Sequence, residues 1–315
     1  MNHNETSRTR AGLIQALAAY GLWGVLPVYF LLLTPAGAVE IVAWRIVWSL
    51  VFCAVLLAVT RSFAHFRELL RDRRLVMTMA VAGAVIVVNW TTFIFATLSG
   101  HVVEAALGYF INPVVTVLLG VLVLHERLRL RQWIAVGISV VAILVIAIGY
   151  GQFPWISLVL AFSFGTYGLI KKRVGGKIDA VSGLSLETLL MSPFAAIALI
   201  VVGTTGGLAF GHAGTGQAIA VVGTGIVTAV PLLLFAGAAR RLPLSTIGLT
   251  QYLAPILQLA VGVAVLHEPM SVGRWVGFGL IWVALILLSW DAFAHGRAGA
   301  AERRQARFEV RETTS

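Results

Sequence analysis

The stretch Pro113-Val-Val-Thr-Val-Leu-Leu-Gly120-Val-Leu-Val-Leu-His125-Glu126 returns later in the chain as Pro255-Ile-Leu-Gln-Leu-Ala-Val-Gly262-Val-Ala-Val-Leu-His267-Glu268. The offset is 142 residues, and it continues to the pairs Trp133/Trp275 and Gly137/Gly279. Nine of the 25 positions from 113 to 137 are identical to their counterparts. Apolar segments resemble one another by chance, but matched proline, glycine, His-Glu and tryptophan positions do not follow from hydrophobicity. The sequence therefore contains an internal duplication.

The composition around this repeat is that of a membrane protein. Of the 315 residues, 59% are hydrophobic and only 11% are charged, whereas a soluble domain carries about 25% charged residues. A segment of roughly 20 apolar residues crosses a hydrocarbon core of about 30 Å. We therefore predict an all-α membrane protein with ten transmembrane helices at 12–32, 38–59, 75–97, 103–124, 132–149, 154–170, 180–202, 217–237, 244–266 and 275–293.

The net charge of +10 has an explanation in membrane topology. With the N-terminus inside, 21 of the 23 lysines and arginines fall in the two tails or in the loops on the cytoplasmic side, as the positive-inside rule requires. The exceptions are Arg274 in an outer loop and Arg45 within a span. Because the basic residues lie between apolar runs, without a motif for base contact, we expect no nucleic-acid partner. The predicted location is the bacterial inner membrane, with both termini cytoplasmic.

Five spans in each copy make an odd number, so the second copy enters the membrane upside down. Arg127, Arg129 and Arg131 follow the first copy of the motif, but Pro269, Ser271 and Gly273 follow the second. The motif thus loses its positive charge where it faces outward. We predict a cytoplasmic tail 1–11, a first repeat 12–149, an inverted second repeat 154–293 and a basic cytoplasmic tail 294–315 that contacts lipid headgroups or solvent.

The sequence resembles the EamA family of the drug/metabolite transporter superfamily, in its RarD-type branch. The resemblance rests on Trp44-Arg45-Ile-Val-Trp48-Ser49, Asn89-Trp90, His101, Glu104-Ala-Ala-Leu-Gly-Tyr-Phe-Ile-Asn-Pro113, Glu126-Arg127-Leu128, Ser163-Phe164, Tyr167-Gly168-Leu169, Gly183-Leu184, Glu187-Thr188, Tyr252 and Pro255. It covers about residues 12–293, and Trp44 stands where a histidine is expected. It implies ten helices, cytoplasmic termini and movement of small metabolites or drugs.

Two charged residues inside the predicted spans are candidates for function, because such residues cost free energy in lipid. Arg45 lies toward the outer side of its span, where it can reach the headgroups or bind a carboxylate of the substrate, of Glu104 or of Glu40. Glu187 lies well inside the span 180–202, with no basic residue within four positions. Such a lone carboxylate suits proton coupling, or else a hydrogen bond between helices.

A second group of candidates lines the spans as polar and aromatic residues. Helical spacing places Tyr109, Asn112 and Thr116 on one face beside Pro113. We interpret this stripe as a cavity wall, with interhelical hydrogen bonding as the competing explanation. The remaining candidates are Asn89, Trp90 and Tyr167 for substrate binding, Gln251, Tyr252 and Gln258 as the counterpart in the second copy, and Glu104 and His101 as an outer gate or wet loop edge.

These patterns predict a secondary transporter of small organic molecules that works by alternating access. Its inverted repeats open the substrate site first to one side of the membrane and then to the other. Export, from family analogy, and proton coupling are the expected mode, in a monomer or homodimer. No Walker motif, Ser-His-Asp set or zinc pattern occurs, so we expect neither enzyme activity nor a cofactor or metal. The alternatives are a membrane-embedded enzyme and a scaffold or sensor without transport activity.

Overall fold

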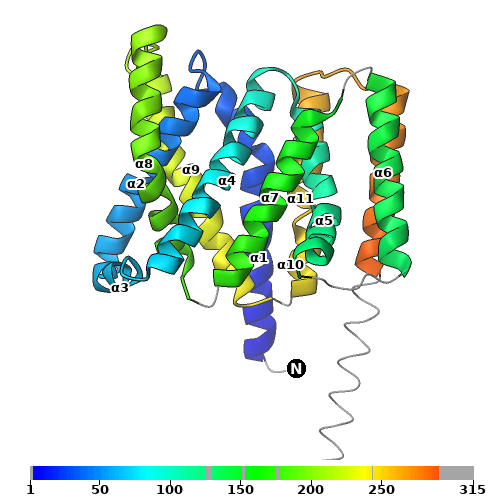
Figure 1. Ribbon diagram of the computed structural model, residues 1–315, viewed down its shortest axis with the longest axis horizontal. Coiled ribbons are helices and arrows are strands. Elements are labelled where there is room, and N and C mark those ends of the chain that lie inside the picture. The colour runs from blue at the N-terminus through cyan, green and yellow to red at the C-terminus, as the bar shows by residue number, and fades with distance from the viewer. Residues whose placement is uncertain (1–2, 125–129, 151–152, 175–176, 243, 291–315) are drawn as a thin grey trace, which may run out of the picture. The chain divides into compact units, whose positions relative to one another are not determined.

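The computed structural model describes residues 3–124, 130–150, 153–174, 177–242 and 244–290 (Figure 1). His125-Glu126, Arg127, Arg129 and the basic tail 294–315 lie outside the described residues. Every regular element of the described part is helical. The elements are α1 (His3–Leu31), α2 (Ala38–Val59), α3 (Phe63–Leu69), α4 (Arg73–Leu98), α5 (Val102–Leu124), α6 (Leu130–Tyr150), α7 (Trp155–Val174), α8 (Ala180–Thr205), α9 (Thr215–Ala239), α10 (Leu244–Thr250), α11 (Leu253–Ala260), the π-helical turn η1 (Val261–Val265) and a final helix, Val272–Trp290.

Eight helical segments of the described chain are long and apolar enough to cross a membrane, which makes the protein a multi-pass membrane protein. They are Thr9–Leu31, Ala38–Val59, Arg73–Leu98, Val102–Val123, Ala180–Thr205, Thr215–Ala239, Thr246–Val265 and Val272–Trp290. The predicted spans 132–149 and 154–170 coincide with α6 and α7, which are helical but do not meet the same criterion. The apolar part of α6 is the shorter segment Gln132–Ile148, and the last turn of α7 carries three basic residues.

Three local features differ from the sequence prediction. The loop predicted after the second span contains the short helix α3. The last helix begins at Val272, three residues earlier than predicted, so that it includes Arg274. The predicted continuous helix 244–266 is interrupted at Gln251 and Tyr252, between α10 and α11. The last difference has a simple cause, because Pro255 has no amide proton to donate to the carbonyl of Gln251 and its ring crowds that carbonyl.

The spacing of the backbone divides the chain into two compact units, and each unit takes segments from both sequence repeats. The first unit comprises residues 1–119 and 154–270, and the second comprises 120–153 and 271–315. In the described part of the second unit, α6 and the final helix pack closely at Gly277, where a Cβ atom would meet the side chain of Ile146 at 2.1 Å. A glycine is therefore required at this crossing.

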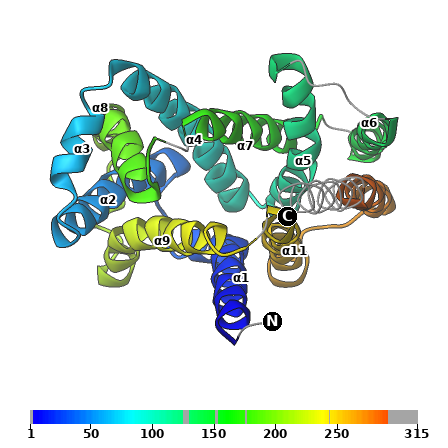
Figure 2. The same ribbon diagram turned by 90° about the horizontal axis from the view of Figure 1, so that it is seen from below.

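In the first unit, α2 packs against both α8 and α9, and α4 packs against α7 and α8 (Figures 1 and 2). The helix α1 packs against α9 and α11. The crossing of α2 and α9 is tightest at Gly225, where a Cβ atom would lie 2.3 Å from the carbonyl oxygen of Trp48. This close approach brings polar side chains of α9 within reach of Arg45 on α2.

Candidate functional site

Arg45 is buried in the middle of the first unit, with 5% of its surface exposed. Its Nε donates a hydrogen bond of 2.8 Å to the hydroxyl of Thr228 on α9. Its guanidinium carbon lies 4.0 Å from the ring centre of Trp90 on α4 and 5.6 Å from that of Phe30 on α1. Three helices thus surround the cation, which does not reach out to the surface.

The two acidic residues considered as partners of Arg45 use their carboxylates elsewhere. Glu40, which is buried, accepts hydrogen bonds from the backbone amides of Ala209 and Phe210 in the segment between α8 and α9. Glu104, at the beginning of α5, accepts a hydrogen bond from the amide of Ile156. Glu40 therefore fixes a connecting segment against α2, and Glu104 joins the beginnings of α5 and α7.

A polar chain connects α4, α5 and α7 next to the Arg45 cluster. The hydroxyl of Tyr109 donates to Asn89 Oδ1 at 3.0 Å. Asn89 Nδ2 in turn donates to the hydroxyl of Ser163 at 3.0 Å and to the carbonyl of Leu160 at 3.2 Å. The ring of Tyr109 also meets that of Phe164 edge to face, with centres 5.8 Å apart. Asn89 and Tyr109 are thus brought together in space although they lie on different helices.

The other two members of the predicted stripe on α5 behave differently. Asn112 Nδ2 donates to the carbonyl of Ala161 on α7 at 3.0 Å, so it forms an interhelical hydrogen bond. The hydroxyl of Thr116 is exposed and donates to the carbonyl of Asn112 within its own helix. In this conformation, the competing explanation of interhelical hydrogen bonding describes Asn112 well.

The second-repeat counterparts lie around the break between α10 and α11. Gln251 and Tyr252 form the break itself, and both are partly buried. Gln258 is buried on α11 and donates from Nε2 to the carbonyl of Trp23 on α1 at 3.2 Å, while its Oε1 accepts no hydrogen bond among the described residues. Gln258 thus joins α11 to α1 and is not part of the Asn89–Tyr109 chain.

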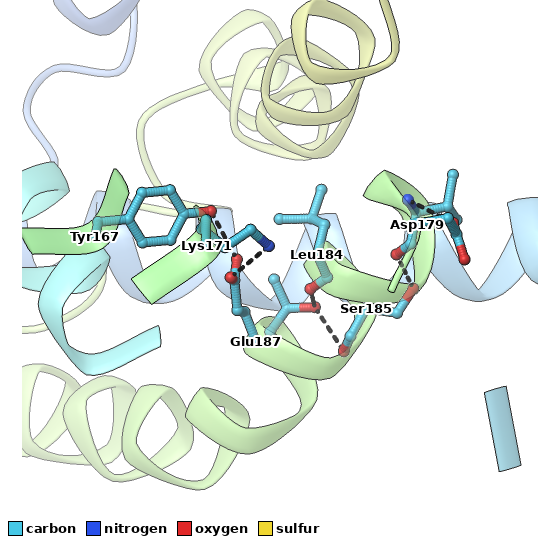
Figure 3. A network of polar contacts seen from close by, with 8 residues as sticks. Tyr167, Lys171, Asp179, Leu184, Ser185 and Glu187 are labelled. Atoms are coloured by element: carbon cyan, nitrogen blue, oxygen red, sulfur yellow. Dashed lines mark hydrogen bonds and ion pairs between the residues drawn. The ribbon is translucent and has the colours of Figure 1, made fainter. Parts of the chain in front are cut away.

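Glu187 is not the isolated carboxylate that the sequence predicted. Its Oε1 lies 3.0 Å from the ammonium group of Lys171, and its Oε2 accepts a hydrogen bond of 3.2 Å from the hydroxyl of Tyr167 (Figure 3). The side chain of Glu187 is 3% exposed and that of Lys171 is 28% exposed. The prediction was wrong because the partner comes from α7, 16 residues earlier, and neighbours within one helix do not reveal it.

Two neighbours make room for this ion pair and extend its polar surroundings. Gly183 lies against the ammonium group, since a Cβ atom at this position would be 2.9 Å from Lys171 Nζ. Cys53 on α2 is buried in one cluster with Leu184 of α8, and the hydroxyl of Ser185 donates to the carbonyl of Val181. The pair therefore lies at the junction of α2, α7 and α8.

Asp179 stands immediately before α8 and caps its first turn. Its Oδ1 accepts hydrogen bonds of 3.0 Å from the amides of Val181 and Ser182. Partial burial raises the pKa of this carboxyl, but the hydrogen bonds from Ser182 and from the two amides outweigh burial and hold the pKa below its usual value. A charged cap thus fixes the start of the helix that carries Glu187.

The predicted gate residue His101 is partly exposed, and its Nδ1 lies 3.1 Å from the hydroxyl of Ser99. Near it, Glu268 from the second repeat is buried, and its carboxylate accepts from the amides of Val102 and Val103 at the beginning of α5. No group of three or more metal-ligating side chains occurs within the part of the chain that the structure describes.

Three residues of these clusters were missed by the sequence analysis, namely Lys171, Thr228 and Glu268 in its contact with α5. Lys171 was counted only as a loop charge, and Thr228 is one of many hydroxyls in apolar helices. Glu268 did carry a signal, since it belongs to the repeated His-Glu motif that follows the predicted span 244–266. The amides that its carboxylate binds, at the beginning of α5, lie 166 and 165 residues earlier in the sequence, and the sequence did not indicate this contact.

Comparison with known proteins places this architecture in a family. The chain matches the model of the EamA-like transporter family twice, over residues 10–148 and 154–290. It therefore belongs to the EamA-like transporter family, a class of membrane transporters.

Within that family, the chain is a RarD-like permease. It is 49% identical to protein RarD of Streptomyces exfoliatus, over 97% of this chain and 95% of the relative. It is 38% identical to the uncharacterized transporter YojE of Bacillus subtilis, over 95% of this chain and 99% of the relative. The chloramphenicol-sensitive protein RarD of Pseudomonas aeruginosa is 31% identical, with coverage of 89% and 94%.

A solved crystal structure also resembles this chain, with a TM-score of 0.55 at 17% sequence identity. The match covers 92% of this chain and 98% of the other. At this level of identity, the resemblance is one of fold alone. Together, the family and the names of the relatives indicate a membrane transporter.

Proposed function

We propose that this permease is a secondary transporter of small organic metabolites or drugs, which works by alternating access through ten spans arranged as two inverted repeats of five. The observation that carries the proposal is the double match to one transporter family, with the two matches meeting between residues 148 and 154. The internal duplication agrees with this division, because its two copies, 113–137 and 255–279, fall in the first and the second matched range respectively. Inverted repeats give two equivalent conformations that open to opposite sides of the membrane.

The proposed location is the bacterial inner membrane, with both termini in the cytoplasm. This orientation is supported by the placement of 21 of 23 basic residues in tails and loops of one side. Helices α6 and α7 complete the ten spans in this proposal. The three basic residues at the end of α7 then lie at the cytoplasmic interface, where long side chains reach water.

The proposed substrate region is the polar and aromatic cluster of the first unit. Arg45, Trp90, Asn89 and Tyr109 come from α2, α4 and α5 and are interlinked through the aromatic contacts among Phe30, Phe93 and Tyr109. Buried polar residues within a membrane protein are costly and are typically retained for function. Asn112, Thr116, Tyr167, Gln251, Tyr252 and Gln258 complete the proposed set, with Glu104 and His101 near the outer ends.

The proposed coupling residue is Glu187. Its carboxylate stands between a neutral donor, the hydroxyl of Tyr167, and the cation of Lys171, whose side chain is 28% exposed. Protonation of the carboxylate removes its attraction for the ammonium group and so frees α7 from α8 at this point. A change in the packing of two helices is the kind of event that links proton binding to alternating access.

The test is flux through purified protein in liposomes, with and without an imposed pH gradient, for a panel of radiolabelled organic compounds. Wild type should accumulate at least one compound against its gradient, in the direction of export, when protons flow the other way. Glu187→Gln should lose this accumulation yet retain exchange of the same compound between the two sides. Glu68→Gln changes an exposed acid on α3 and is the matched control.

Accumulation by Glu187→Gln that equals wild type would refute the coupling role. Absence of flux for the whole panel in wild-type liposomes would count against transport itself and favour a scaffold or sensor. Conversion of a compound without its movement would favour an enzyme.

A further inference from the structure

We propose that the substrate of this transporter is an organic anion, a carboxylate on an aromatic or apolar body, and that Arg45 recognises its negative charge. This inference rests on the proposed function, because it names the class of molecule that the transporter carries. It is drawn from the balance of buried charges in the first unit and from the geometry around the guanidinium.

The buried carboxylates of the described chain are all engaged away from Arg45. They belong to Glu40, Glu187 and Glu268. Glu40 binds the amides of the segment before α9, Glu187 binds Lys171, and Glu268 binds the first amides of α5. Arg45 itself forms no ion pair among the described residues, and its hydrogen-bond partner is the neutral hydroxyl of Thr228. Within the described part of the chain, its charge therefore lacks a protein counter-ion, a costly arrangement in a membrane unless a ligand supplies one.

The guanidinium is also held in an orientation that suits a carboxylate. Nε is occupied by Thr228, and the cation lies over the Trp90 ring, so the group is fixed on two sides. Among the described residues, the two terminal amino groups donate no hydrogen bond, and these two groups form the fork that binds a carboxylate through both oxygens. Within the described part of the chain, two buried polar atoms in the next turn of α2 also lack a hydrogen-bond partner, Trp48 Nε1 and Ser49 Oγ.

The same geometry argues against a cationic substrate. The aromatic face of Trp90, a predicted substrate-binding residue, already holds the cation of Arg45. A second positive charge beside it is repelled, and the repulsion is strong where water is excluded. Phe30, Phe93 and Tyr109, which meet edge to face with ring centres 5.6 to 6.0 Å apart, provide the apolar contact for the body of the substrate.

The test compares molecules of similar shape that carry a negative, a neutral or a positive group. Phenylacetate, phenylacetamide and 2-phenylethylamine form one triplet, and the corresponding indolyl and naphthyl compounds form two more. Binding to the full-length protein in lipid nanodiscs is measured by calorimetry, and flux is measured in liposomes. Wild type should bind at least one carboxylate about tenfold or more tightly than its amide, as expected for charge-assisted hydrogen bonds, and should bind the amine weakest.

Arg45→Gln should abolish the preference for the carboxylate over the amide, and Arg45→Lys should retain part of it. Lys172→Gln removes an exposed positive charge of α7 and is the control, with the preference unchanged. If the Arg45 variants do not fold, the relative affinities of the wild-type protein for the carboxylate, the amide and the amine decide whether the proposal stands. Equal binding within every triplet, tighter binding of the amines, no binding of any carboxylate, or a preference that survives Arg45→Gln would overturn the proposal.

The two proposals fail in different ways. Flux of neutral or cationic compounds without a preference for carboxylates would leave the transporter in place and remove the anion specificity. Binding of carboxylates that depends on Arg45, without flux, would support the site and count against transport.

Discussion

The pair of Lys171 and Glu187 leads to a prediction in which two single substitutions have unequal effects. Lys171→Met leaves the carboxylate of Glu187, 3% exposed, with only the Tyr167 hydroxyl to neutralise its charge. Removing one partner of a buried pair costs about 3–5 kcal/mol. Glu187→Gln leaves Lys171, which is 28% exposed and can turn its ammonium group to water, so we expect a loss of about 1 kcal/mol.

The double substitution removes both charges and should be less damaging than Lys171→Met alone, which corresponds to a coupling energy of more than about 1 kcal/mol. The free energy of unfolding is measured by titration with sodium dodecyl sulfate in mixed micelles, for wild type, both single variants and the double variant. The control cycle uses His65 and Glu68, a solvent-exposed pair on α3 at 4.0 Å. Its coupling energy should be below about 0.5 kcal/mol. Equal losses for the two single variants, adding up in the double variant, would refute the reasoning.

Two further predictions concern how the helices of the first unit are held. Gly225→Ala places a Cβ atom 2.3 Å from the Trp48 carbonyl oxygen and should cost about 1–3 kcal/mol of unfolding free energy by the same titration, whereas Gly216→Ala, with open space around it, should cost little. Asp179→Ala removes the cap of α8 and should cost about 1 kcal/mol at pH 7. Because the folded-state pKa of Asp179 is below its usual value of 3.8, the extra stability of its charged form is present above that value and declines as the pH falls through the folded-state pKa. A difference between wild type and Asp179→Ala that does not shrink on acidification would contradict this assignment.

Much of the architecture followed from local sequence. The long apolar segments became helices close to the predicted ranges, because a chain in lipid must satisfy its backbone hydrogen bonds within each segment. The break before Pro255 was missed, although proline provided the signal for it. The sequence also singled out Arg45 and Glu187, since a charge within an apolar run is conspicuous.

What the sequence determined by itself was therefore the class of protein, its helices and the positions of two buried charges, Arg45 and Glu187, all properties of residues close together in the chain. Only the tertiary structure decided the partners of those charges. Arg45 meets Thr228 across 183 positions, and Glu187 meets Lys171 on another helix. Such pairs depend on how each helix is rotated and how closely it approaches its neighbour. That approach is set by packing at a few points such as Gly225, and hydrophobicity, which is alike on all sides of these helices, does not specify it.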